Sequence, residues 1–243
     1  MTGASSGIGA HFARVLAKAG ARVVLAARRL DLLEELRAGI EASGGKAIVV
    51  PLDVADEQST RAAYDRAEAA FGTVEIVVAN AGISTGGSAF DLPVEEFDTL
   101  LAINLRGVFV TVREGARRLI AAGSPERENG RIIIISSITA HRVDVGASAY
   151  SATKAGVSQL GRVLAKDWAR KGISVNMILP GYIRTELNRD YLDSEWGAKM
   201  TAKFPRKRLM DVDALSDVLL LLASDAGRAI TGAEFTVDDG QSL

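Results

Sequence analysis

Cysteine is absent from the 243 residues of this chain. Its absence excludes disulfide bonds, thiolate zinc sites and catalytic cysteine nucleophiles. A chain without disulfides suits a reducing compartment, so we expect a cytoplasmic protein. The chain has two histidines, His11 and His141, and neither has an arranged carboxylate partner in the sequence, so we expect no metal site.

Long apolar runs and blocks of one charge are also lacking. The longest apolar segments, Ile132–Ile135 and Val218–Ala223, are far shorter than the ~20 residues that a membrane-spanning helix needs. The 29 lysines and arginines nearly balance the 30 aspartates and glutamates. We therefore expect neither a membrane nor a nucleic-acid partner.

Aromatic residues make up only 5% of the chain, although 48% of it is hydrophobic. The apolar content is carried by small and aliphatic residues, which favours helices packed closely on a parallel sheet. The length suits one α/β domain over residues 1–243 and leaves little room for a second.

Strand-like apolar runs alternate with amphipathic helical patterns along the whole chain. The predicted strands are Arg22–Ala26, Ala47–Leu52, Val74–Ala79, Arg131–Ser136, Ser174–Leu179 and Glu234–Val237. The predicted helices are Gly9–Ala19, Leu30–Ser43, Glu57–Phe71, Val94–Ala121, Ala149–Lys171 and Asp213–Ala223. This alternation predicts a Rossmann-like, doubly wound parallel sheet with right-handed crossovers. Residues 186–210 are less regular and more charged, and we interpret them as a substrate-covering segment.

A glycine-rich run, Thr2–Gly9, leads directly into the first predicted helix. Gly3 and Gly7 allow a tight turn, and Gly9 allows the helix to pack closely. The free N–H groups of the turn and the helix dipole favour a pyrophosphate. The alternative is a glycine-rich helix entry that binds no ligand, since the spacing differs from that of the G-x-G-x-x-G motif.

Two arginines, Arg28 and Arg29, follow the first predicted strand, where a dinucleotide-binding fold places the adenosine ribose. No acidic residue is present there to bind the ribose 2′-hydroxyl. Arg28 could instead hold a 2′-phosphate, so we predict NADP rather than NAD, with NAD still possible. The alternative is a solvated pair of charges at the start of a helix.

Polar and small residues follow the next two predicted strands. Asp53 could accept a hydrogen bond from the adenine amino group. In Asn80-Ala81-Gly82, the small residues let the backbone approach a ligand, and Asn80 can brace neighbouring strands. Each of these residues could equally serve as a helix cap or a turn residue.

The strongest candidate for a catalytic group is formed by Ser137, Tyr150 and Lys154. Tyr150 and Lys154 stand at i and i+4, so they share one helix face about 6 Å apart along the axis. A nearby ammonium, helped by an oxidised nicotinamide, would lower the phenol pKa from about 10 and let Tyr150 act as acid or base. Ser137 could donate to the same substrate oxygen. The alternative is a core tyrosine beside a lysine that reaches solvent, which the pair by itself would favour.

Together these motifs resemble the short-chain dehydrogenase/reductase family, in its single-domain branch. The matching features are Thr2–Gly9, Asp53, Asn80–Gly82, Asn104, Ser137, Tyr150–Lys154, Pro180–Thr185, Ile230–Gly232 and Val237–Gly240. They follow the family's order over nearly the whole chain.

The resemblance implies an oxidoreductase that transfers a hydride between NADP(H) or NAD(H) and a small ketone or secondary alcohol. It implies a catalytic tetrad in which Tyr150 is the acid/base, Lys154 lowers its pKa, Ser137 orients the substrate, and Asn104 bends its helix and holds a relay water. The implied cofactor-binding residues are Gly3, Ser5, Ser6, Gly7, Ile8, Gly9, Arg28, Asp53, Val54, Asn80, Ala81, Gly82, Tyr150, Lys154, Pro180, Gly181, Ile183 and Thr185. Family members commonly form dimers or tetramers through the helices that carry Asn104 and Tyr150, so we expect a homo-oligomer and favour a homotetramer.

The sequence departs from the family pattern at its start. The family's sheet has the order 3-2-1-4-5-6-7, and its first strand precedes the glycine loop, whereas only Met1 precedes Thr2 here. Burying three or four aliphatic residues in that central strand would contribute roughly 5–10 kcal/mol. We therefore expect the native reading frame to begin upstream.

A second function remains open, which is a catalytically silent cofactor sensor or scaffold with the same fold. Such relatives usually lack the tyrosine or the lysine, and this chain keeps both Tyr150 and Lys154. A longer-branch epimerase or dehydratase is disfavoured by the length of the chain and by the glycine spacing.

Overall fold

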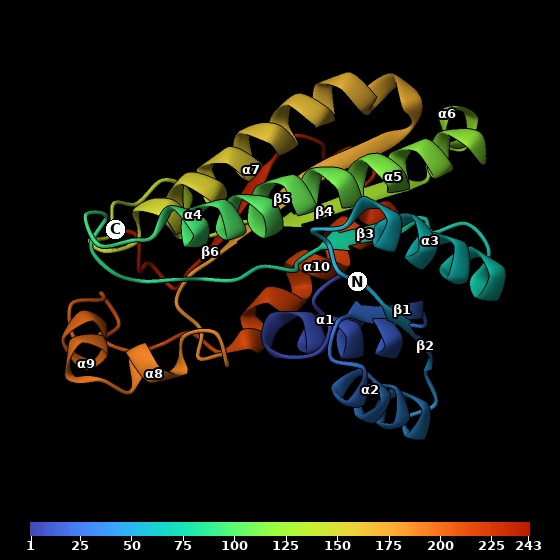
Figure 1. The fold of residues 1–243 in the computed structure, drawn as a ribbon. Coiled ribbons are helices and arrows are strands. Elements are labelled where there is room, and N and C mark those ends of the chain that lie inside the picture. Colours follow the sequence, from blue (N-terminus) through green and yellow to red (C-terminus); the bar gives the residue numbers. More distant parts are fainter.

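The computed structural model describes all 243 residues and has six strands that alternate with helices (Figure 1). The strands are β1 (Arg22–Ala27), β2 (Lys46–Pro51), β3 (Ile76–Ala79), β4 (Gly130–Ile135), β5 (Ile173–Pro180) and β6 (Glu234–Val237). All six predicted strands are therefore present. The third is shorter than predicted, because its pairing with β4 begins at Ile76 rather than at Val74.

The helices cover the sequence between the strands. They are α1 (Gly7–Lys18), α2 (Leu30–Ala42), α3 (Glu57–Phe71), α4 (Val94–Leu100), α5 (Val108–Ala121), α6 (Ser124–Arg127), α7 (Ser148–Trp168), α8 (Arg189–Leu192), α9 (Glu195–Thr201) and α10 (Ser216–Ala223). A π-helix, η1 (Leu101–Gly107), joins α4 to α5, so the single helix predicted over 94–121 contains a wider turn. No helix is both long and apolar enough to cross a lipid bilayer.

All strand pairs are parallel, which confirms the predicted α/β class. The strands form a two-stranded sheet, β1-β2, and a four-stranded sheet in the order β3-β4-β5-β6. Met1 and Thr2 connect the two sheets: the Ala26 N–H donates to the Met1 carbonyl at 3.0 Å, and the Thr2 N–H donates to the Val78 carbonyl at 3.1 Å. The sheet is thus interrupted between β1 and β3, where we expected the family's first strand to be missing, and these two residues lie in its place.

A small apolar cavity of about 50 Å³ lies beside this connection. Val24 of β1, Val77 of β3 and Ala63 and Ala67 of α3 contribute to its lining. Hydrophobic side chains therefore border the gap between the two sheets, so the gap lies in the interior of the fold.

Helices cover both faces of the sheets, as the predicted doubly wound fold requires. Every residue of β4 is buried, and its isoleucines alternate between two cores. Ile133 and Ile135 pack in a core with residues of α1, α2 and α10, whereas Ile132 and Ile134 pack with residues of α3, α5 and α7. Figure 1 shows α5 and α7 along one side and α1 and α2 on the other. Ligands of such sheets bind where the strands end, and that edge holds a cavity of about 420 Å³.

Candidate active site

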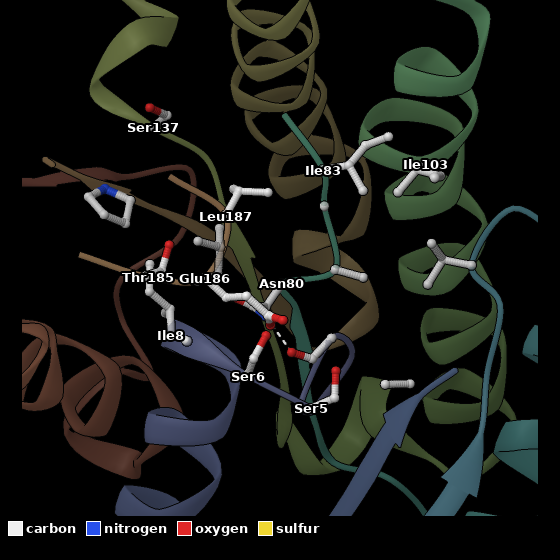
Figure 2. Close-up of a pocket in the computed structure, with 18 of the residues that line it drawn as sticks. Ser5, Ser6, Ile8, Asn80, Ile83, Ile103, Ser137, Thr185, Glu186 and Leu187 are labelled. Atoms are coloured by element: carbon white, nitrogen blue, oxygen red, sulfur yellow. Dashed lines mark hydrogen bonds between the residues drawn. The ribbon is translucent and has the colours of Figure 1, made fainter. Parts of the chain in front are cut away.

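A cavity of about 420 Å³ opens at the carboxyl ends of β1, β3, β4 and β5 (Figure 2). The predicted site residues that line it are Gly3, Ser5, Ser6, Gly7, Ile8, Arg28, Asp53, Val54, Asn80, Ala81, Gly82, Ser137, Tyr150, Lys154, Pro180, Gly181, Ile183 and Thr185. Two predicted residues, Gly9 and Asn104, lie outside the lining. The structure therefore brings most of the sequence-predicted set to a single cavity, although its members are spread over 183 positions from Gly3 to Thr185.

The glycine loop is fastened to the end of β3 by hydrogen bonds. The Asn80 side-chain amide donates to the carbonyls of Thr2 at 3.1 Å and Gly3 at 3.2 Å. In return, the Thr2 hydroxyl accepts from the backbone N–H groups of Asn80 at 3.0 Å and Ala81 at 3.1 Å. This is the bracing expected of Asn80, and it fixes the loop against the strand that carries Gly82.

The N-terminus of α1 faces the cavity with free donors. Its N-cap, Ser6, makes no side-chain capping bond, and no acidic residue stands in the first turn. Gly7 has a φ of +53°, which favours glycine, and it lines the cavity. The free N–H groups and the positive end of the helix dipole therefore suit an anionic group such as a phosphate.

Gly9 contributes through packing rather than by lining the cavity. A Cβ at this position would lie 2.2 Å from the Gly3 carbonyl oxygen and 2.6 Å from Nδ2 of Asn80. No side chain fits at that distance, so glycine lets α1 press against the loop. This agrees with the close packing predicted for Gly9 and explains why it is absent from the lining.

Ser137, Tyr150 and Lys154 meet at the end of the cavity formed by β4 and α7. Ser137 follows β4, and the i, i+4 pair lies near the start of α7. The Lys154 Nζ lies 5.5 Å from the centre of the Tyr150 ring and donates to the Ile135 carbonyl at 2.9 Å. Ser137 and Tyr150 line the same cavity as Lys154. The structure thus joins all three groups that the sequence singled out.

Burial dominates the electrostatics of the pair. Burial raises the pKa of Tyr150 to about 12, and the nearby Ser137 hydroxyl only partly opposes this rise. The Lys154 ammonium is turned toward the Ile135 carbonyl, and it does not offset this burial in the protein without cofactor. That Lys154 and an oxidised nicotinamide together lower the pKa of Tyr150 stays a prediction. Tyr150 is a neutral phenol at neutral pH and can donate a proton.

Lys154 carries the opposite shift, since burial lowers the pKa of its ammonium to about 8. For an amine, a lowered folded-state pKa means that the folded protein binds fewer protons than the unfolded chain between pH 8 and 10.5. The cost of burying the charge is therefore full below pH 8 and fades as the pH rises to 10.5. At neutral pH this cost is roughly 3 kcal/mol.

We expect Lys154→Met to stabilise the protein at pH 7, by about 2 kcal/mol after the hydrogen bond to Ile135 is lost. The advantage of the variant should shrink as the pH approaches 10. Urea unfolding at pH 7 and pH 10 measures both effects. Lys166→Met, an exposed lysine on the same helix, is the control and should show no such pH dependence. A variant that is equally destabilised at both pH values would contradict the expected cost.

Asn104 lies fully buried within the π-helix η1 and braces the loop after β3. Its Oδ1 accepts from the Ile83 N–H at 2.9 Å, and its Nδ2 donates to the Ile83 carbonyl at 2.8 Å and the Thr153 hydroxyl at 3.3 Å. A Cβ on Gly82 would lie 3.3 Å from Asn104 Oδ1 and 3.7 Å from Lys154 Nζ. The predicted bend at Asn104 is therefore a π-helical turn, and the asparagine lies beside the lysine.

The structure adds residues that sequence reasoning missed. Glu186 lines the cavity and forms an ion pair with Arg29 at 2.7 Å. Asn188 holds the turn before it, because its Oδ1 accepts from the Thr185 N–H at 2.9 Å and its Nδ2 donates to the Ile183 carbonyl at 2.9 Å. Other unpredicted lining residues are Ala26, Ala27, Leu52, Ile83, Ile103, Ile135, Ser136 and Leu187. Most of these are aliphatic, and no motif distinguished them from core residues.

The chain is similar to known proteins over nearly its whole length. Residues 3–242 match the family described as enoyl-(acyl carrier protein) reductase. The L-rhamnose 1-dehydrogenase (NAD(P)(+)) of Azotobacter vinelandii is 39% identical over 249 residues, which cover 99% of this chain and 94% of that protein. Two solved structures are also similar. A short-chain type dehydrogenase/reductase from Mycobacterium marinum has a TM-score of 0.94 and 34% identity, over 100% of this chain and 94% of the other. A gluconate 5-dehydrogenase from Burkholderia cenocepacia, in complex with NADP and tartrate, has a TM-score of 0.92 and 35% identity, over 99% and 92% of the two chains.

Proposed function

The chain belongs to the short-chain dehydrogenase/reductase family, and we propose that it transfers a hydride between a nicotinamide dinucleotide and a ketone or secondary alcohol. One observation carries the proposal. Ser137, Tyr150 and Lys154 meet at a cavity of about 420 Å³ that also reaches the free N-terminus of α1. A dinucleotide needs both an anion site and a reactive end, and this cavity offers the two together.

The cavity fits a dinucleotide on its own geometry. Beside the free N-terminus of α1, Gly3 has a φ of +64°, and a Cβ there would lie 2.8 Å from Ala81 Cα, so only glycine leaves this surface open. We assign Gly3, Gly7 and Ile8 to the phosphates and Asp53 to the adenine. Pro180, Ile183 and Thr185 would contact the nicotinamide end. When bound, the cofactor supplies or accepts the hydride.

The protein's own residues would manage the proton. With a pKa of about 12, Tyr150 holds its proton at neutral pH and can donate it to the substrate oxygen during reduction. Ser137 orients that oxygen by donating a hydrogen bond. The Lys154 ammonium lies beside the tyrosine ring and stabilises the phenolate that forms after the proton has left. Asn104 positions Gly82 and Lys154 through its bonds to their chain neighbours, Ile83 and Thr153.

We propose NADP as the preferred cofactor. Arg28 lies exposed at the edge of the cavity directly after β1, and no carboxylate occupies the end of that strand. Among the relatives, the Burkholderia structure holds NADP, and the Azotobacter enzyme is named for either cofactor, NAD(P)(+). A location in the cytoplasm stays a prediction from the absence of cysteine.

A homo-oligomer, dimer or tetramer, is proposed on the helices that the family uses for assembly. Phe109 and Ile120 on α5 and Val163 on α7 leave 36%, 36% and 47% of their surfaces exposed. Figure 1 shows α5 and α7 running along the same outer side of the molecule. Light scattering on the purified protein tests the state of assembly, and a monomer at micromolar concentration would contradict it.

The activity is tested by mixing the protein with a panel of ketones and secondary alcohols and either cofactor, and following the nicotinamide absorbance. We expect turnover, with NADP preferred. Arg28→Ala should raise the KM for NADP by about tenfold and leave the KM for NAD unchanged, because a lost charge-assisted contact to phosphate is worth ~1.5 kcal/mol. Arg14→Ala, an exposed arginine on α1, is the control. Strict preference for NAD in the wild type would refute the cofactor assignment.

A further inference from the structure

Three segments distant in the sequence meet at Arg29, at the mouth of the cavity. Its guanidinium donates to the Ser5 hydroxyl at 3.1 Å, to the Ser6 hydroxyl at 2.9 Å and to the Glu186 carboxylate at 2.7 Å. Ser5 and Ser6 belong to the glycine loop, Arg29 precedes α2, and Glu186 begins the segment that we expect to cover the substrate. In Figure 2 the side chain of Glu186 points toward Ser6 across the cavity.

The neighbourhood of Arg29 is suited to an anion. The Ser5 and Ser6 hydroxyls hold the Arg29 guanidinium at the cavity mouth, on the side of the free N-terminus of α1, and the guanidinium pairs there with a carboxylate. The hydrogen bond and the positive charge of Arg29 lower the pKa of Glu186 to about 2, so Glu186 remains an anion at every physiological pH. The Glu186 carboxylate thus neutralises the Arg29 cation, as an anionic ligand bound at this place would.

A ligand phosphate can replace Glu186 in its ion pair with Arg29. The Arg29 and Glu186 side chains are 43% and 52% exposed, and ion pairs in water are weak. A phosphate monoester carries nearly two negative charges and accepts an arginine fork at two oxygens, so it competes well with a single carboxylate. Arg28, the neighbouring cation, has no ion-pair partner among the salt bridges of the structure, so it can receive the same phosphate.

We propose that Glu186 is a specificity-determining residue that competes with the 2′-phosphate of NADP for Arg29. This inference rests on the proposed function, and it adds Glu186 as a residue that disfavours NADP. NADP must displace the Glu186 carboxylate from Arg29, whereas NAD, which has no 2′-phosphate, leaves the pair in place. The NADP-to-NAD preference therefore reflects the strength of the ion pair as well as the attraction of Arg28.

The test measures Kd for NADP and for NAD by calorimetry on the wild type and on Glu186→Gln. The variant should bind NADP about three- to fivefold more tightly, the gain expected from releasing one exposed ion pair. Its Kd for NAD should change by less than about twofold. Glu195→Gln is the matched control. It removes an exposed carboxylate in the same segment that pairs with Lys199 rather than with an arginine. An unchanged ratio of the two affinities in Glu186→Gln overturns the proposal.

A double-mutant cycle separates competition from simple charge repulsion. Arg29→Ala should weaken NADP binding. Adding Glu186→Gln to Arg29→Ala should give no gain in NADP affinity, because the arginine for which Glu186 and the 2′-phosphate compete is no longer there. A gain that persists without Arg29 would mean that Glu186 only repels the phosphate, and it would overturn the competition. If neither the wild type nor any variant binds a dinucleotide, the proposed function falls as well. If the wild type binds and turns over but the ratio is unmoved, only this inference fails.

Discussion

Tyr150→Phe is expected to lower kcat by about a hundredfold to ten-thousandfold while leaving the Kd for NADP within about twofold of wild type. Phenylalanine keeps the ring that packs near Lys154 and removes only the hydroxyl. That hydroxyl is the proton donor of the proposed reaction, and a positioned acid or base contributes ~10²–10⁴ in rate. The change in kcat comes from nicotinamide absorbance under saturating substrate, and the cofactor affinity comes from calorimetry.

Tyr64→Phe provides the matched control for this experiment. Tyr64 is also a buried tyrosine, but its hydroxyl donates to the carbonyl of Thr111 in α5 at 3.0 Å, and it does not line the 420 Å³ cavity. We expect that variant to lose about 1 kcal/mol of stability and to keep its turnover. If Tyr150→Phe turns over as fast as Tyr64→Phe, the acid/base role is wrong. If the wild type binds cofactor and reduces nothing, the chain is a silent sensor instead.

The order of strands and helices could be predicted because it depends on local patterns. Ile132–Ile135 is uniformly apolar, and the structure buries it between helices on both faces. The Tyr150 and Lys154 pair could also be predicted, since i and i+4 positions must share a helix face. The candidate catalytic group and the glycine loop could therefore be located from the sequence.

Other features could not be predicted because they depend on distant contacts. Burial raises the pKa of Tyr150 in the protein without cofactor, and the direction of this shift depends on how much water the folded chain excludes. Arg29 and Glu186 are 157 positions apart, and no spacing rule links them. How Met1 and Thr2 connect β1 and β3 likewise depends on which backbone groups these two residues reach in the folded protein. Each of these is set by three-dimensional packing rather than by a local pattern.

The close packing at Gly9 was predicted from the sequence. How short the contacts of a Cβ at this position would be could not be predicted. The Gly3 carbonyl that blocks a Cβ at this position is held in place by the Asn80 amide, and Gly3 itself has a φ of +64°. Moving the Gly3 carbonyl or its loop away would cost free energy, because the hydrogen bond to Asn80 would be lost. A side chain at position 9 would therefore separate α1 from the loop that is proposed to hold the cofactor phosphates.

Gly9→Ala is accordingly expected to destabilise the fold by about 3 kcal/mol, the upper range for inserting a methyl group into a packed interior. For a chain of this size, that corresponds to a fall in Tm of about 6–12 °C. Cofactor binding should weaken at the same time, because the displaced α1 N-terminus no longer presents its N–H groups to the anion. Differential scanning calorimetry and a cofactor titration measure the two effects.

Gly39→Ala tests whether these losses come from the collision or from removing a glycine. Gly39 lies within α2 and is exposed, and a Cβ at this position would have no neighbouring atom within 4 Å. Alanine there should stabilise the helix by about 1 kcal/mol, so the two identical substitutions are expected to move Tm in opposite directions. If both variants gain stability, the Gly3 carbonyl can move aside, and the rigid loop on which the proposed phosphate site depends does not exist.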